Sequence, residues 1–154
     1  MTEDAGELAV RPLEAADRSD WEQLWIGYHA HGPFGGPPPP PAVTEATFAR
    51  VLAGDPMLAL VAVQDGGLVG IVHAVLHPVT SSDKPACFLN DLFVAERARR
   101  CGVGRRLVES LYDLARAKGA FRVYWHMQVA NATAAKLYDS VASRSGHTVF
   151  RRAL

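Results

Sequence analysis

One stretch of this chain constrains its fold more than any other. A strand-forming segment, Phe88–Val94, passes through a turn that contains Gly102 and Gly104. Leucines that recur at i, i+4 and i+7 from Leu107 then predict an amphipathic helix over roughly 104–118. The unpaired N–H groups at a helix start attract anions, and glycine lets a phosphate approach the backbone closely. The stretch therefore predicts a phosphate-binding turn, with a solvated basic turn as the alternative.

Two common phosphate-binding motifs do not fit this turn. A P-loop requires Gly-Lys-Ser/Thr, which the turn lacks. A dinucleotide-binding fold requires a third glycine, but Leu107 occupies that position, and the acidic residue expected about twenty residues later is absent. Arginines nevertheless surround the turn, at positions 97, 99, 100, 105 and 106. The phosphate ligand therefore belongs to another class.

The remaining segments predict an α+β fold with a mixed sheet. Two apolar runs flank Asp65-Gly66, which predicts a hairpin. The five prolines Pro37–Pro41 exclude helix interior and central strand, so we expect a surface loop over 32–41. Thr44 is the expected N-cap of a short helix, and Val79–Lys84 is an expected polar loop. The other expected elements are strands over 8–13, 57–63, 68–76, 86–94, 121–129 and 147–151, and helices over 17–30, 104–118 and after Asn131.

Composition narrows the function classes. With 154 residues, 49% hydrophobic and 21% charged, the chain is predicted to form a single globular domain over 1–154. Its 16 basic residues balance its 16 acidic residues, which argues against a nucleic-acid partner. Cys87 and Cys101 lack the spacing of a disulfide framework or a metal site. The N-terminus does not resemble a signal peptide, and no apolar run could span a membrane. We expect a cytoplasmic protein without a metal.

Two motifs together resemble the GNAT superfamily of N-acetyltransferases. They are Arg-x-x-Gly-x-Gly over 99–104 and Asn-Ala-Thr-Ala-Ala-Lys-Leu-Tyr over 131–138. The likeness covers nearly the whole chain and is greatest to the spermidine/spermine-type and yeast histone-acetyltransferase-like members. It implies a mixed, V-splayed sheet flanked by helices, which is the acyl-CoA N-acyltransferase fold. It also implies acetyl transfer from acetyl-CoA to a primary amine.

The resemblance assigns roles to particular residues. Acetyl-CoA would lie between the strands 88–94 and 121–129, with its pantetheine paired to the first strand like an added strand and its pyrophosphate held by the glycine turn. Tyr138 would be the general acid that protonates the departing thiolate, although its helical position alone would suit a core aromatic residue. The implied cofactor contacts are Leu92, Phe93, Val94, Arg99, Arg100, Cys101, Gly102, Val103, Gly104, Arg105 and Asn131, the last also being the expected helix cap.

The resemblance does not assign the general base or the acceptor amine. Related spermidine/spermine-type enzymes carry a glutamate where this chain has Asn90, which cannot accept a proton. Strand alternation would direct Asp91 to the opposite face, where it would serve the fold or a dimer. The other candidate bases are His73, His77, Asp83 and His126.

We expect the acceptor to enter between the helix over 21–30, the proline loop and the loop over 79–84. A small-molecule amine is the favoured acceptor, and a protein lysine or N-terminus is the alternative. Homologous folds imply a homodimer through the last strand. A non-catalytic acyl-CoA-binding module and a scaffold that binds partners through Pro37–Pro41 are the competing functions.

Overall fold

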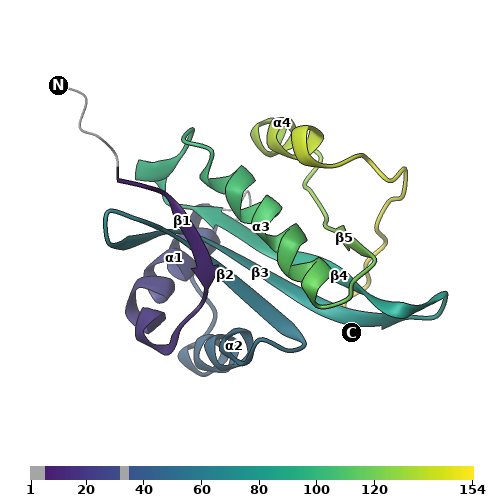
Figure 1. Ribbon diagram of the computed structural model, residues 1–154, viewed down its shortest axis with the longest axis horizontal. Coiled ribbons are helices and arrows are strands. Elements are labelled where there is room, and N and C mark those ends of the chain that lie inside the picture. The colour runs from purple at the N-terminus through teal and green to yellow at the C-terminus, as the bar shows by residue number, and fades with distance from the viewer. Residues whose placement is uncertain (1–5, 32–34) are drawn as a thin grey trace.

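Five strands form one mixed sheet in the order β1-β2-β3-β4-β5 (Figure 1). The computed structural model describes residues 6–31 and 35–154. The first four strands pair antiparallel, whereas β4 and β5 pair parallel, which confirms the predicted mixed sheet. The strands are β1 Ala9–Pro12, β2 Met57–Gln64, β3 Gly67–Val79, β4 Ser82–Val94 and β5 Arg122–Tyr124.

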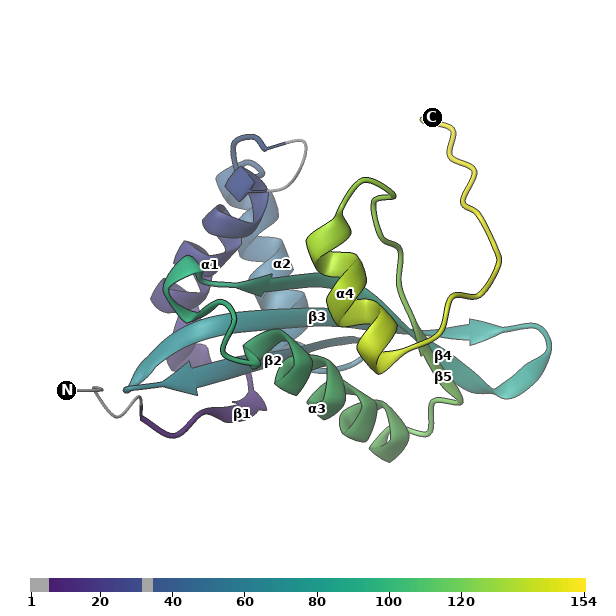
Figure 2. The same cartoon turned by 90° about the horizontal axis from the view of Figure 1, so that it is seen from above.

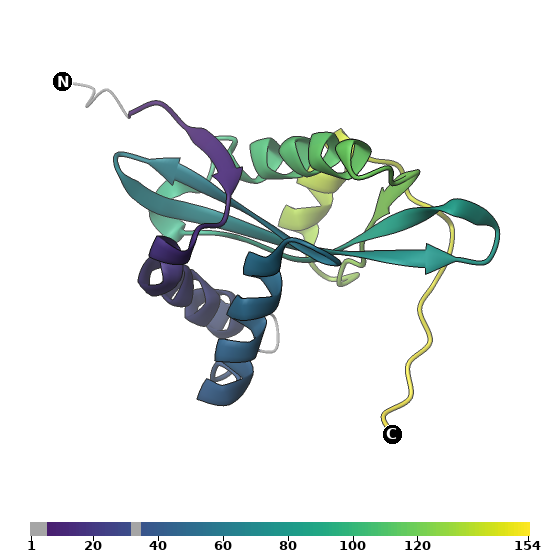
Figure 3. The same ribbon diagram turned by 60° about the horizontal axis from the view of Figure 1, so that its bottom comes forward.

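Helices cover both faces of the sheet. Figure 3 shows α1 and α2 beneath the sheet and α3 and α4 above it. One buried apolar cluster joins Trp21 and Phe48 to the lower face, and the other joins Leu107 and Leu111 to the upper face. The helices are α1 Arg18–His31, α2 Pro41–Ala53, α3 Val103–Ala117 and α4 Ala132–Val141, with short 3-10 turns at Ala15–Asp17 and Glu96–Ala98.

The predicted hairpin at Asp65-Gly66 is confirmed, but the predicted loop over 79–84 is wrong. Asp65 and Gly66 both have positive φ, 53° and 76°, as a tight hairpin turn requires. The next hairpin extends further than expected, because Val79 pairs with Ser82 and the strands continue to the turn between them. The polar residues there reflect solvent exposure of a projecting ribbon rather than a loop (Figure 2).

The start of α2 also differs from the prediction. The helix begins at Pro41 rather than after Thr44, since proline at the first helical position sacrifices no hydrogen bond. Thr44 is buried inside the helix instead of capping it. Residues 37–40 lie outside helix and strand, as predicted, whereas 32–34 of the expected proline loop lie outside the described residues.

The C-terminal part of the chain has less sheet than its sequence pattern predicts. The strand expected over 121–129 is limited to Arg122–Tyr124, and the segment expected as a strand over 147–151 is irregular. Alternating apolar residues favour an extended backbone, but a strand also needs a hydrogen-bonding neighbour. Beyond Tyr124 the chain leaves β4, and residues 142–154 run out from the sheet (Figure 2).

Candidate active site

The sheet opens between β4 and β5. The two strands pair only from Ala86 to Phe88, so the described part of the chain places no strand against the rest of β4 on this side. The Ala95 amide donates to the Val69 carbonyl of β3 at 2.8 Å. Because antiparallel pairing alternates, the backbone groups of Phe93 point to β3, whereas those of Leu92 and Val94 point to the open edge. This edge can accept an extended ligand.

The turn after β4 leads into α3, whose first backbone N–H groups have no hydrogen-bond partner within the helix. Arg100 and Gly102 adopt positive φ, 64° and 76°. The Arg106 amide makes a 3.0 Å bond to the Gly102 carbonyl, so the amides of Val103, Gly104 and Arg105 lie before the first intrahelical bond. No side chain caps these amides. A phosphate could therefore bind there, where the helix dipole is positive.

Arg99 lies between the open edge and this turn. Its Nε donates to the Val94 carbonyl at 3.2 Å, and its guanidinium lies 5.7 Å from the Phe93 ring centre. Cys101 is exposed, and Arg105 pairs with Glu109 at 3.0 Å. The structure thus brings the predicted cofactor residues of strand and turn together at one end of β4.

Gly104 has a packing role that the sequence analysis did not anticipate, whereas its predicted phosphate contact stays a prediction. We predicted that it clears space for phosphates, but a Cβ at this position would lie 3.1 Å from Cδ2 of Leu137 in α4. Its missing side chain therefore lets α4 pack against α3. Tyr112 of α3 also holds α4, since its hydroxyl donates to the Val141 carbonyl at 2.8 Å.

α4 carries the predicted acid. Asn131 caps the helix as expected, because its Oδ1 accepts from the Ala134 amide at 3.1 Å. Tyr138 packs edge-on against Trp125, with ring centres 5.3 Å apart. Burial raises the pKa of Tyr138 above its ordinary value. The phenol therefore keeps its proton at neutral pH and can donate it.

A bulge in β4 overturns the prediction that Asn90 and Asp91 face opposite ways. His73 of β3 pairs with Asp91, but its neighbour Ala74 pairs with Leu89, so Asn90 is the extra residue. As a result, Asn90 Nδ2 donates to Asp91 Oδ1 at 3.0 Å. Strict alternation fails wherever a bulge inserts one residue.

Asp91 is a buried carboxylate with several donors around it. Its exposed fraction is 7%, and its Oδ2 lies 2.9 Å from His73 Nδ1. Burial alone would raise its pKa, but interactions with His73, Tyr28 and Asn90 outweigh burial and lower it. Asp91 is therefore ionised at neutral pH.

Tyr28 of α1 links this carboxylate to the predicted acid. Burial raises the pKa of Tyr28 most, the charge of Asp91 raises it further, and Tyr138 adds a smaller contribution. The phenol thus lies within electrostatic reach of both residues. The sequence gives no functional signal for Tyr28, because Tyr28 continues the apolar helical spacing of Trp21, Leu24 and Trp25.

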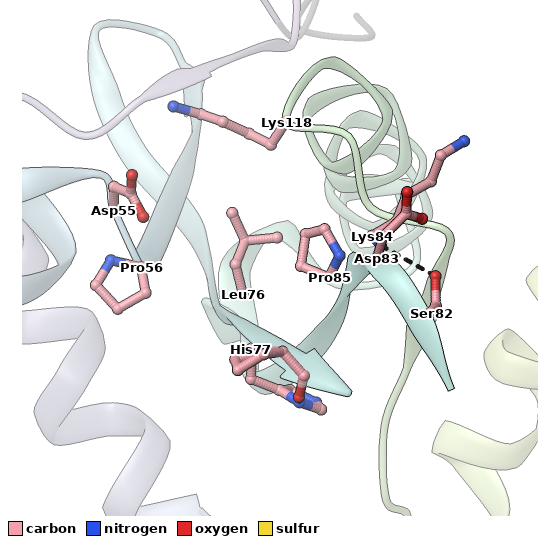
Figure 4. Close-up of a pocket in the computed structure, with 10 residues that line it drawn as sticks. Asp55, Pro56, Leu76, His77, Ser82, Asp83, Lys84, Pro85 and Lys118 are labelled. Carbon is pink, nitrogen blue, oxygen red and sulfur yellow. Dashed lines mark hydrogen bonds between the residues drawn. The ribbon is translucent and has the colours of Figure 1, made fainter. Parts of the chain in front are cut away.

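Of the other candidate bases, His77 and Asp83 lie further along the β3–β4 hairpin, and His126 follows β5. His77 Nε2 is 2.7 Å from the Tyr124 hydroxyl, and His126 packs on Phe88 with ring centres 5.0 Å apart. Asp83 is exposed and lines an open hollow of about 390 Å³ beside the hairpin (Figure 4). This hollow shares none of its lining residues with the predicted cofactor site.

The sequence over residues 18–142 matches the acetyltransferase (GNAT) family. The D-amino-acid N-acetyltransferase HPA3 of Saccharomyces cerevisiae is 33% identical over 150 residues, which is 94% of this chain and 90% of the relative. The thialysine N-epsilon-acetyltransferase of Caenorhabditis elegans is 40% identical over 53 residues, 34% of this chain and 33% of the relative.

A solved structure has the same fold. The structure of AAC(6')-Iy in complex with a bisubstrate analogue of CoA superposes with a TM-score of 0.82 at 19% identity, over 97% of this chain and 99% of that chain.

Within the described residues, no helix is long and apolar enough to cross a bilayer. The same residues contain no group of three or more His, Cys, Asp or Glu side chains suited to a metal ion.

Proposed function

Because the chain belongs to the GNAT acetyltransferase family, we propose that it transfers the acetyl group of acetyl-CoA to the primary amine of a small molecule. One observation carries this proposal. The open β4 edge leads at one end to the uncapped start of α3, the buried Asp91 precedes Leu92 on the same strand, and α4, which carries Tyr138, packs through Leu137 against Gly104 of α3. A thioester on that edge would have an acid and a base available.

The cofactor contacts follow from this arrangement. The outward-facing backbone groups of Leu92 and Val94 would pair with the pantetheine arm, with Phe93 beneath it. Asn131, at the start of α4, would contact the pantetheine end. The turn from Arg99 to Arg105, including Arg100, Cys101, Gly102, Val103 and Gly104, would hold the pyrophosphate.

We assign the two proton transfers to Asp91 and Tyr138. A primary ammonium has a pKa of about 10.4, so a proton must leave before the nitrogen attacks. Asp91 would take that proton, and the free amine would attack the thioester carbonyl carbon. When the carbon–sulfur bond breaks, Tyr138 would give its proton to the sulfur. The nitrogen loses its second proton as the amide forms, and that proton would restore the Tyr138 phenol, so that the net reaction releases one proton, to Asp91. The exposed Asn90 would contact the acceptor at the mouth of the site.

A panel of amines tests the proposed acceptor class. Purified protein with acetyl-CoA should release free thiol with small primary amines, and D-amino acids and thialysine belong in the panel because relatives act on them. Turnover confined to peptides would instead favour a protein acetyltransferase. Coenzyme binding without turnover of any amine would favour a non-catalytic acyl-CoA-binding module.

Asp91→Asn tests the assigned base. This change keeps the shape of the side chain but removes its basicity, so kcat/KM should fall by about 10²–10⁴-fold. Asp83→Asn is the matched control, since it removes an exposed carboxylate from the same strand and should leave kcat/KM within about twofold. An Asp91→Asn variant as active as the control would exclude Asp91 as the base.

The remaining expectations concern assembly and compartment. We propose a homodimer through residues 142–154, because this irregular segment exposes Val149 and Phe150, at 58% and 93%. A strand edge of a second copy would bury them. The two free cysteines, Cys87 and Cys101, support a reducing compartment such as the cytoplasm.

A further inference from the structure

His73 is a fully buried histidine whose two ring nitrogens both have partners. Its exposed fraction is 1%. On one side, Trp21 Nε1 lies 3.0 Å from His73 Nε2, and on the other, His73 Nδ1 lies 2.9 Å from Asp91 Oδ2. The rings of Trp21 and Trp25 pack around the imidazole, with centres 5.9 Å and 5.4 Å from it. The ring is therefore held between one indole and one carboxylate.

The indole decides which nitrogen carries the proton. A tryptophan N–H can only donate a hydrogen bond, so His73 Nε2 must accept it and cannot bear a hydrogen itself. A proton there would place two N–H groups against each other at 3.0 Å. The single ring proton then lies on Nδ1 and is donated to Asp91. We propose that Trp21 locks His73 as a neutral Nδ1–H donor, and that both are positioning residues for the carboxylate that deprotonates the acceptor amine.

This lock matters for the strength of the base. An imidazolium at His73 would neutralise Asp91 and weaken its attraction for a proton, whereas a neutral donor orients the carboxylate and leaves its negative charge intact. The groups that interact with Asp91 are Tyr28 from α1, His73 from β3 and Asn90 from its own strand. This inference rests on the proposed role of Asp91 in the acetyl transfer.

Nitrogen NMR of the imidazole tests the lock without any activity. The wild-type protein should show the Nδ1–H tautomer of His73. Trp21→Phe keeps an aromatic ring but removes the donor, so His73 should gain the Nε2–H tautomer. A wild-type His73 that carries a proton on Nε2 would overturn the proposal.

Trp25→Phe is the matched control. Trp25 stacks on Trp21 one helical turn away, with ring centres 5.6 Å apart, and is similarly buried. Its Nε1 has no hydrogen-bond partner within the described chain. This variant should therefore leave the His73 tautomer as in the wild type, although it also replaces a buried indole by a phenyl ring. An equal change in both variants would show that loss of packing, not of the donor, is responsible.

Kinetics separate positioning from a merely structural role. His73→Asn can place an amide N–H where Nδ1 was, so it should keep kcat/KM within about fivefold of the wild type. His73→Leu removes the donor, so kcat/KM should fall by about 10²-fold and its acid limb should move to higher pH. Equal loss in both variants with an unmoved acid limb would overturn the role.

The two proposals can fail separately. If Asp91→Asn keeps its activity, the base assignment fails, yet the NMR result still reports the lock. If Asp91→Asn is inactive but Trp21→Phe leaves both the tautomer and the acid limb unchanged, the lock fails while the proposed function stands. Trp21→Phe must first show a cooperative unfolding transition, and a variant that does not fold is replaced by the His73→Asn and His73→Leu pair.

Discussion

The pKa values of the proposed acid, Tyr138, and the proposed base, Asp91, are shifted in opposite directions. Burial raises the pKa of Tyr138, which keeps a proton ready for the leaving sulfur. Donors around Asp91 outweigh its burial and lower its pKa, which keeps the carboxylate ionised, as the proposed base must be before it takes a proton. Environments that push two pKa values apart are typical of an acid and a base in one site.

Tyr138→Phe removes the proposed acid but keeps the ring. We expect kcat to fall by about 10²-fold, because the thiolate would leave without a proton donor. The Kd for coenzyme A, measured by calorimetry, should change by less than about twofold. Tyr112→Phe is the control, since it loses only the 2.8 Å bond to Val141 and should cost about 1 kcal/mol of stability with kcat largely kept. An unchanged kcat in Tyr138→Phe would remove its acid role.

The sequence predicted which residues form local motifs at the site better than it predicted the directions in which side chains point. The glycine turn and the Asn131 cap could be predicted because each belongs to a local motif, and the same holds for the position of Tyr138 on α4, whose acid role stays a prediction. Asp91 could not, since its direction depends on a bulge at Asn90 that only the pairing of β3 with β4 reveals. Tyr28 could not either, because its partners lie on other elements.

At the scale of elements, α3 has a glycine with positive φ near each end, but only the glycine before the helix lies in the proposed pyrophosphate turn. Gly102 before the helix and Gly119 after it have φ of 76° and 82°, and a Cβ at either would meet open space. A substitution at either glycine therefore strains the backbone to a similar degree. If only the substitution at Gly102 weakens ligand binding, the cause is the position of Gly102 in the turn and not the backbone strain.

Gly102→Val should weaken coenzyme A binding by about tenfold or more, since a branched side chain is disfavoured at positive φ and would distort the turn that presents the α3 amides. Gly119→Val carries a similar backbone cost, about 1–2 kcal/mol, without touching the turn. Titration calorimetry should thus show a raised Kd in the first variant only. Equal Kd values in both would contradict the assignment of the pyrophosphate to this turn.

Elements with local signals were predicted well, and elements that need a distant partner were not. The hairpin at Asp65-Gly66 and the helix α3 follow from turn chemistry and apolar spacing. By contrast, β5 ends at Tyr124 and residues 147–151 form no strand, because strand formation depends on a neighbour that no sequence pattern specifies.

At the scale of the whole molecule, the exposed C-terminal segment predicts self-association. Val149→Asp combined with Phe150→Asp should convert a dimer into a monomer, because charges oppose burial of that segment. Sedimentation velocity gives the mass. Val129→Asp is the control, since Val129 is 98% exposed outside the segment and should leave the dimer intact. A wild-type protein that sediments as a monomer would contradict the proposal.

Amide NMR during a titration with coenzyme A tests the central claim most directly. The account predicts that the largest shift changes fall on the amides of Leu92, Val94 and Val103–Arg105, which lie on the open edge and the start of α3. Changes confined to the hollow beside the hairpin, around Lys84 and Lys118, would contradict it.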